Sequence, residues 1–113
     1  MEVKRGEIYL CDLNPVVGTE QAGIRPVLVI QIDKANKVSP HTIIIPFTTK
    51  IRDAILPSHT KIPSGVGGLK EDSVLLCEQI RVIDKKRLIK RIGSLNDAFL
   101  NQVIESLKII LGL

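Results

Sequence analysis

The hydrophobic positions of this chain fall into short runs that predict a series of β-strands. Runs of four to eight residues rich in Ile, Val and Leu, bounded by Gly, Pro, Asn or Asp, are typical of strands. The most apolar β-branched run covers residues 42–47 and predicts a central strand. Further strands are expected over residues 7–13, 26–31, 59–62 and 73–77, the last of which is expected to run on to residue 82.

The pattern changes to a helical repeat near the C-terminus. Starting at Asn96, hydrophobic residues recur at helical spacing, and Gly112 follows where a C-terminal cap belongs. The residues expected on the apolar face are Phe99, Leu100, Val103, Ile104, Leu107 and Leu111. This pattern predicts one amphipathic helix that packs against the strands.

The connecting segments are expected to be short. Residues 33–40 predict a polar turn with a single helical turn, and residues 63–68 a glycine-rich turn. Asp84 is expected to cap a short basic helix over residues 85–91, which Gly93 and Ser94 would break. Several short strands followed by one helix predict the α+β class. We expect one domain over residues 1–113, a small, strongly bent antiparallel β-barrel with the C-terminal helix lying on it.

Composition narrows the function classes only slightly. Hydrophobic residues make up 44% of the chain and aromatic residues 3%, so the core is expected to consist of Ile, Leu and Val. The scarcity of aromatics argues against RNA binding by stacking on rows of Phe or Tyr. The net charge of +4 is compatible with a polyanionic partner. No segment reaches the ~20 apolar residues of a membrane span, so we expect a cytoplasmic protein without membrane contact.

The cysteines and histidines do not form a recognisable metal or catalytic motif. Cys11 and Cys77 lie in apolar strand patterns without a CxxC spacing, and we interpret them as buried small hydrophobic residues. His41 and His59 begin two different expected strands and are interpreted as strand-end residues. No metal and no cofactor is expected.

The stretch from Asn14 to Gln31 holds the densest candidate chemistry. A polar loop with Glu20, Gln21 and Arg25 leads into the apolar run of the next strand. Arg25 directly precedes Pro26, which pushes its backbone toward an extended conformation. The guanidinium is therefore expected at the mouth of a rigid strand, where it can bind a phosphate or form a structural salt bridge with Glu20 or Asp12.

Four motifs in this chain resemble the MazF/PemK toxin family. They are Arg5-Gly6-Glu7-Ile8-Tyr9, Gly18-Thr19-Glu20-Gln21-Ala22-Gly23-Ile24-Arg25-Pro26-Val27, Pro46-Phe47-Thr48-Thr49, and Glu78-Gln79-Ile80-Arg81-Val82-Ile83-Asp84. They occur in the family's order and at its spacing over essentially the whole chain. The resemblance implies an SH3-like barrel and a metal-independent endoribonuclease that cleaves single-stranded mRNA at preferred sequences. It also implies a homodimer and a cognate MazE-like antitoxin.

The resemblance places the active site at Arg25 and Thr48. RNA cleavage requires a base for the 2′-OH, an acid for the 5′-oxygen, and stabilisation of charge on the phosphorus. The planar set of donors on Arg25 can stabilise the negative charge on the phosphorane, and the hydroxyl of Thr48 can hydrogen-bond a phosphate oxygen. Glu20 is the candidate base. Some members use a His in the loop and an Arg–Asp pair instead. This chain has Thr19, Leu76 and Glu78 at those positions, so the base stays open.

Further residues are candidates for holding the RNA. Gln21, Leu56, Glu78 and Gln79 are expected to contact bases, and Lys50 and Arg52 the backbone. Thr19 and Thr49 are also assigned to the RNA-binding set. A basic cluster from Lys85 to Arg91 is interpreted mainly as a solvated face. The alternative function is a non-enzymatic binding module on the same fold, because the resembling superfamily includes toxins that poison DNA gyrase by protein contact.

Overall fold

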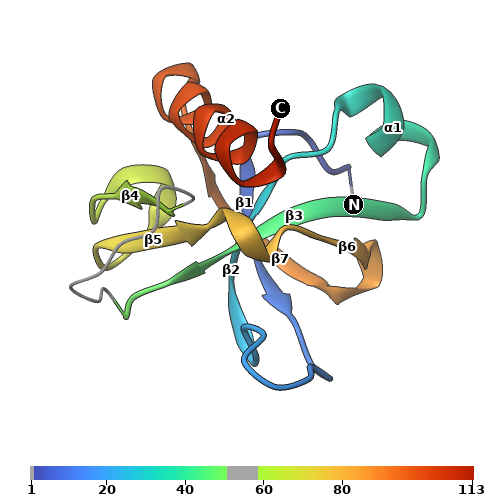
Figure 1. Cartoon of the computed structure of the whole chain (residues 1–113). Coiled ribbons are helices and arrows are strands. Elements are labelled where there is room, and N and C mark those ends of the chain that lie inside the picture. The colour runs from blue at the N-terminus through green and yellow to red at the C-terminus, as the bar shows by residue number, and fades with distance from the viewer. Residues whose placement is uncertain (1, 51–58) are drawn as a thin grey trace.

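The structure is a computed structural model that describes residues 2–50 and 59–113. The described residues form an antiparallel sheet of seven strands with a C-terminal helix, as the sequence predicts (Figure 1). The strands are β1 (Glu7–Asp12), β2 (Ile24–Val29), β3 (His41–Thr48), β4 (His59–Ile62), β5 (Ser73–Leu76), β6 (Arg81–Asp84) and β7 (Leu88–Ser94). The helices are α1 (Asp33–Val38) and α2 (Asp97–Leu111), and single 3-10 turns are η1 (Val66–Gly68), η2 (Cys77–Gln79) and η3 (Lys85–Arg87).

Strand β3 is the centre of the sheet, as its apolar run predicts. Its middle pairs with β2, its first half with β6, and its end with β5. The strand order is β4-β5-β3-β2-β1-β7, with β6 beside β3 off this path. The change of partner along β3 bends the sheet strongly, which gives the barrel-like shape seen in Figure 1.

The two ends of the sheet meet without hydrogen-bonded strand pairing. The η1 turn, which connects β4 to β5, packs its backbone against β7. A Cβ atom added at Gly93 would lie 2.2 Å from the carbonyl oxygen of Gly67, and one at Gly68 would lie 2.1 Å from that of Ile92. This contact therefore requires glycine at both positions, and it closes the barrel-like fold opposite β3.

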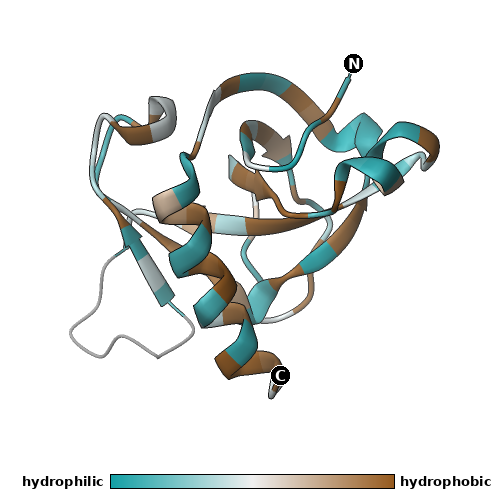
Figure 2. Cartoon of the chain, turned by 90° about the horizontal axis from the view of Figure 1, so that it is seen from above, coloured by the Kyte–Doolittle hydropathy of each residue, from teal (hydrophilic) through white to brown (hydrophobic). Residues whose placement is uncertain are grey.

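The alternation of side chains along the strands produces one core on each face of the sheet. Ile8, Leu28 and Phe47 belong to the core beneath α2, which contributes Val103. Tyr9 and Val27, from the alternate positions, belong to the core on the other face. Hydrophobic and hydrophilic positions alternate along α2 as predicted (Figure 2). The Asn96 side chain caps its first turn by accepting from the Phe99 amide at 3.0 Å, and Gly112 ends it with φ +71°.

Both cysteines are buried, in agreement with their interpretation as small hydrophobic residues. Burial raises the pKa of the Cys11 thiol to about 11, and the same cause raises the pKa of Cys77 to about 11. Both thiols are therefore protonated at neutral pH. No helix among residues 2–50 and 59–113 is long and apolar enough to cross a membrane.

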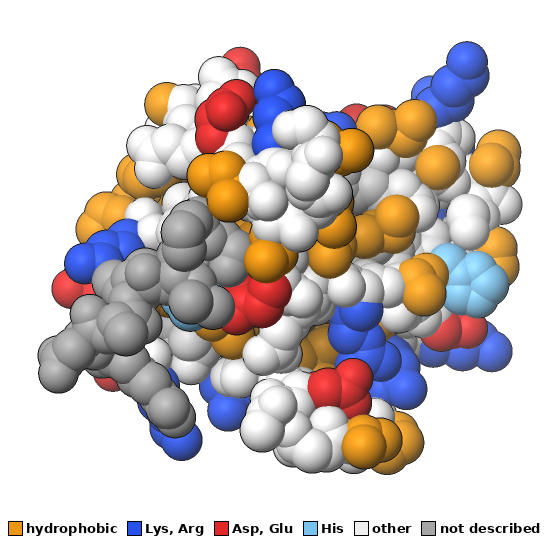
Figure 3. Space-filling model, in the orientation of Figure 1, with side chains coloured by type: hydrophobic (Ala, Val, Ile, Leu, Met, Phe, Trp, Pro, Cys, Tyr) orange, Lys and Arg blue, Asp and Glu red, His pale blue; other side chains and the backbone are white. Residues whose placement is uncertain are grey.

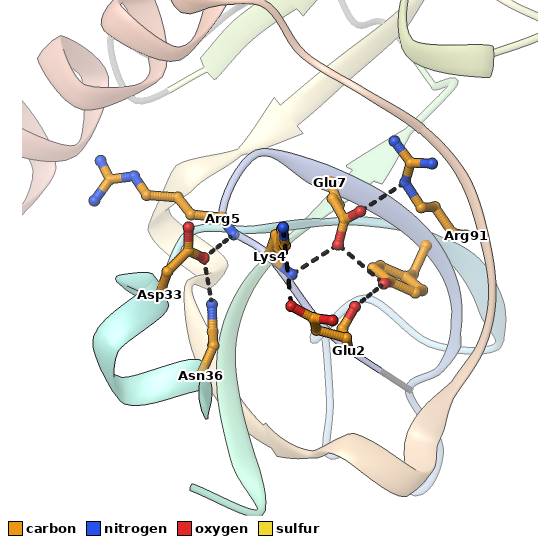
Figure 4. A network of polar contacts seen from close by, with 8 residues as sticks. Glu2, Lys4, Arg5, Glu7, Asp33, Asn36 and Arg91 are labelled. Atoms are coloured by element: carbon orange, nitrogen blue, oxygen red, sulfur yellow. Dashed lines mark hydrogen bonds and ion pairs between the residues drawn. The ribbon is translucent and has the colours of Figure 1, made fainter. Parts of the chain in front are cut away.

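A polar network fixes the N-terminal segment to the sheet (Figure 4). Glu7 accepts from the Tyr9 hydroxyl at 3.0 Å and from Arg91 Nε at 2.7 Å, while Asp33 accepts from the Arg5 amide at 2.7 Å. Burial, and next the hydrogen bond to Glu7, raise the pKa of Tyr9 to about 12. This network lies among β1, α1 and β7.

The expected helix over residues 85–91 is wrong. Only Lys85–Arg87 forms a 3-10 turn, and strand β7 begins at Leu88 and includes Gly93 and Ser94. Asp84 does cap the turn, since its carboxylate accepts from the Lys86 amide at 2.8 Å. The strand forms because its pairing with β1 buries Leu88 beside Cys11. A basic helix at this edge would not bury Leu88 in this way.

The expected continuous strand over residues 73–82 is also wrong. The 3-10 turn η2 interrupts it, and the two halves, β5 and β6, pair with opposite ends of β3. The expected helical turn in residues 33–40 is confirmed as α1, and the other strands agree with prediction to within about two residues at each end.

Candidate functional site

The loop between β1 and β2 is held closed at its base. The Leu13 amide donates to the Gly23 carbonyl at 3.0 Å, and the Gly23 amide donates to Asn14 Oδ1 at 3.2 Å. Arg87, from the turn before β7, also holds the loop, because its Nη1 donates to the carbonyl of Asp12 at 3.2 Å and to that of Asn14. These contacts give the loop a fixed exit into β2, where Arg25 is the second residue.

Arg25 is half-buried and its guanidinium is anchored on one side. Its Nε donates to the Ala22 carbonyl. The side-chain oxygen of Gln21, in the amide orientation that satisfies both of its ends, accepts from Arg25 Nη1 at 2.7 Å and from Nε at 3.1 Å. Within the described residues Arg25 forms no ion pair, so the alternative of a salt bridge with Glu20 or Asp12 is not observed.

Thr48 lies on the same face of the sheet as Arg25. Val27 pairs with Pro46, and Arg25 and Thr48 are each two residues from that pair, toward the same end of the sheet. Residues two apart in a strand share a face. Thr48 is buried at the end of β3, and its hydroxyl oxygen accepts from the Lys50 amide at 3.2 Å. The register thus brings an arginine and a hydroxyl to one end of one face.

A hollow of about 200 Å³ opens beside Gln21, the residue that anchors Arg25, although neither Arg25 nor Thr48 is among the residues that line it. It lies between the β1–β2 loop and the segment from η2 to β6. Gln21 and Glu20 line it from the loop, Pro46 from β3, and Glu78 and Gln79 from η2. Four residues predicted for the site, from two distant segments of the chain, therefore surround one hollow.

The carboxylates in this hollow have partners other than Arg25. Glu20 is exposed, and its Oε1 accepts from the Val17 amide at 2.6 Å, which closes a turn within the loop. Glu78 Oε2 lies 2.9 Å from His59 Nε2, which links η2 to β4. His59 is thus a half-buried partner of Glu78 and more than the strand-end residue that the sequence predicts.

The remaining predicted residues are more scattered. Thr19 is exposed in the loop and Lys50 is exposed after β3. Thr49 lies on the opposite side of β3, where it lines a different hollow together with Pro26. Arg52 and Leu56, both predicted to bind RNA, lie outside the described residues.

Comparison with known proteins identifies the family. The profile of the "PemK-like, MazF-like toxin of type II toxin-antitoxin system" family matches residues 4–111. This chain is a member of that toxin family. It is 50% identical to "Endoribonuclease EndoA" of Bacillus subtilis (strain 168), over 100% of this chain and 97% of the relative.

Solved structures of similar toxins share the fold. MazF from Deinococcus radiodurans matches with a TM-score of 0.85 at 24% identity, covering 100% of this chain and 99% of that one. A mycobacterial endoribonuclease in complex with its cognate antitoxin matches with a TM-score of 0.82 at 22% identity, covering 98% and 96%. At these identities the two structures support only the barrel-like fold of this toxin and no further property.

Sequence reasoning missed one charged residue of the candidate site. Arg81, on β6, lines the hollow, and its Nη1 donates to the Leu13 carbonyl at 3.5 Å. Its position in the same motif as Glu78 and Gln79 could have indicated it. The basic cluster of residues 85–91 is largely committed to other contacts, since Lys85 and Arg87 donate to backbone carbonyls and Arg91 pairs with Glu7.

Proposed function

We propose that this chain is the toxin of a type II toxin–antitoxin module and acts as an endoribonuclease. Its proposed substrate is single-stranded RNA, chiefly mRNA, which it cleaves at preferred sequences in the cytoplasm. The observation that carries this proposal is the anchored guanidinium of Arg25, on the same face and at the same end of the sheet as Thr48. The 50% identity to a protein named as an endoribonuclease supports the same conclusion.

The arrangement suits attack of a ribose 2′-OH on the adjacent phosphorus. Among the described residues, Nη2 of Arg25 has no partner, so it is available to a phosphate oxygen as negative charge develops. The Thr48 hydroxyl can donate to the same group. Glu20 is the proposed base, because its carboxylate lines the neighbouring hollow. We propose that Gln21, Glu78 and Gln79 meet an unpaired base there, since RNA sequence is read mainly on single-stranded bases.

The remaining RNA contacts are proposed along the same end of the sheet. Thr19, Thr49 and Lys50 are exposed there, and we propose that they contact the RNA backbone together with Arg52. Leu56 is proposed to contact a base. A positively charged surface gives binding that weakens as salt rises.

We predict that cleavage survives metal removal. We assign charge stabilisation to the guanidinium of Arg25, which carries its positive charge permanently and needs no metal to do so. Purified protein is incubated with a long single-stranded RNA in excess EDTA, and discrete fragments are expected. A strict requirement for Mg²⁺ or Mn²⁺ would contradict the proposed site. Intact RNA together with inhibition of DNA gyrase would instead support the non-enzymatic alternative.

We also propose a homodimer that uses the apolar groove between α2 and α1. This groove, of about 530 Å³, is lined by Ile43, Ile80, Leu107 and Leu111 among others. Leu111 is 51% exposed. Figure 3 shows hydrophobic side chains gathered between the two helices, with Lys and Arg side chains below them. An exposed apolar patch of this kind marks an interaction site, and Ile80 also lines the hollow beside Arg25.

The predicted mass in sedimentation at micromolar concentration is twice the 12.5 kDa of one chain. Leu111→Glu places a charge in the groove and should shift the equilibrium to monomers, because an unpaired carboxylate resists burial. Gln102→Glu, on an exposed position of α2, is the matched control and should leave the dimer intact. A wild-type monomer that still cleaves RNA would contradict this proposal.

A MazE-like antitoxin is the proposed protein partner of this chain. We propose that a flexible antitoxin segment with Asp and Glu between apolar anchors binds across the Arg25 end of the sheet and folds as it binds. It should compete with uncleavable RNA, and both affinities should weaken with salt because exposed charges are screened over ~8 Å at physiological ionic strength. If RNA stays bound at saturating antitoxin, the two partners bind different surfaces.

A further inference from the structure

Three residues from three segments form a chain of hydrogen bonds that ends on Arg25. Gln79, at the end of η2, accepts through Oε1 from the backbone amide of Gln21 at 2.7 Å. With the Gln21 amide assigned in the orientation that satisfies both of its ends, its side-chain oxygen in turn accepts from Arg25 Nη1 at 2.7 Å and from Nε at 3.1 Å. The contact between Gln79 and Gln21 joins residues 58 positions apart, so it ties the loop to a separate part of the fold.

This chain of contacts selects which N–H groups of Arg25 remain for a ligand. A guanidinium has five N–H donors in a fixed plane. Ala22 and Gln21 occupy Nε and one side of Nη1, whereas both N–H groups of Nη2 lack a partner among the described residues. Because the plane is rigid, fixing one edge also fixes the direction of the free edge.

The η2 turn is a firm support for Gln79. It contacts α2, β3 and β4, and Cys77 at its start is fully buried. Glu78, the residue before Gln79, is joined to His59 on β4 at 2.9 Å. Next to His59, the buried hydroxyls of Thr60 and Ser106 bond at 2.8 Å and join β4 to α2. The position of Gln79 is therefore set by packed elements, whereas Gln21 belongs to a loop whose tip is exposed.

We infer that Gln79 is a positioning residue for Arg25, acting through Gln21. It holds the loop so that the free edge of the guanidinium is already in place before RNA binds. This inference rests on the proposed ribonuclease function, and it gives Gln79 a role beyond base contact. A preset guanidinium stabilises charge in the transition state without reorganising at the moment of reaction. Loss of the Gln79 contact should therefore lower kcat more than it raises KM.

The test compares Gln79→Met with Gln79→Glu. Methionine has a similar length but no oxygen to accept from the Gln21 amide, whereas glutamate keeps that acceptor. We expect Gln79→Met to lower kcat about tenfold, because small misplacements of catalytic groups can reduce rates by up to ~10². KM should rise by a smaller factor than kcat falls, and Gln79→Glu should recover most of kcat. Gln102→Met, the same change on the exposed side of α2, should have no effect.

A second readout does not depend on activity. In ¹⁵N spectra of the RNA-free protein, the Nε–H resonance of Arg25, assigned by its loss in Arg25→Ala, should shift and exchange faster with water in Gln79→Met. It should be unchanged in Gln102→Met. Thermal unfolding of each variant shows whether the fold is retained.

The outcomes separate this inference from the proposed function. If the wild type cleaves RNA but Gln79→Met changes only KM or the fragment pattern, Gln79 reads a base and the positioning role is overturned. An unchanged Arg25 resonance in Gln79→Met overturns it as well. If the wild type leaves RNA intact, the proposed function fails, while a shifted resonance would still support the contact chain.

Discussion

Replacing Arg25 with alanine should reduce the rate of RNA cleavage by roughly 10²–10³-fold, the usual effect of removing a donor that stabilises transition-state charge. The substitution removes the N–H groups that the fold leaves unpaired beside Thr48. Single-turnover cleavage of a labelled RNA measures the chemical step directly. Arg25→Lys should remain nearly inactive, because an ammonium cannot both donate to the Gln21 oxygen and present a planar edge of donors to a phosphate.

The control for this prediction is a charge removed elsewhere. Lys34→Ala, on an exposed position of α1, changes the net charge equally and should leave cleavage unchanged. Arg25→Ala should keep its fold, since the guanidinium is half-buried and forms no ion pair among the described residues. Near wild-type cleavage by a folded Arg25→Ala protein would show that the reaction occurs at another site.

The largest expected effect on stability is that of Gly93→Ala. The added Cβ would lie 2.2 Å from the Gly67 carbonyl oxygen and 2.4 Å from its carbon, both of which are backbone atoms that cannot rotate away. Overpacking of this kind typically lowers the free energy of unfolding by about 1–3 kcal/mol. Because the atoms that the new Cβ would meet belong to the backbone and cannot move aside as a side chain can, we expect a loss of about 3 kcal/mol, the upper end of that range. Urea unfolding at equilibrium measures the loss.

Gly65→Ala is the matched control. Gly65 has φ +87° but no atom within 4 Å of an added Cβ, whereas Gly93 has no positive φ. The control thus introduces backbone strain alone, of roughly 1 kcal/mol. Equal, small losses for the two variants would mean that η1 does not pack tightly on β7 and that the barrel is more open than described.

The elements that the sequence predicted correctly are those whose signal is local. The β-branched run of β3 and the helical repeat of α2 each contain enough residues for a period to be recognised. Asn96 and Gly112 mark the ends of α2 by capping chemistry within a few residues. These features together predicted the α+β class and the barrel-like fold.

The wrong predictions have a common physical cause. Residues 88–94 have no decisive local pattern, and their pairing with β1 is a contact between distant parts of the chain. The break at η2 arises because β3 has room for two partners in succession, β6 and β5. Tertiary pairing therefore overrode the local preference in both segments.

The candidate site was predictable to a similar degree. The loop pattern before Pro26 indicates Arg25, the resemblance adds Thr48, and the strand register places both residues on one face. The bond from Gln21 to Gln79 could not be predicted, because a side chain that accepts from a distant backbone amide leaves no spacing in the sequence. The same holds for the contact of His59 with Glu78.

We propose that RNA is cut at the Arg25 and Thr48 end of the sheet. Mapping both ends of every fragment of one natural RNA, cut in EDTA by the wild type and by Arg25→Ala in parallel, tests it most directly. We expect cuts within one short recurring sequence for the wild type and none in the same time for the variant. The same cuts by both proteins, or no cuts by the wild type, would contradict it.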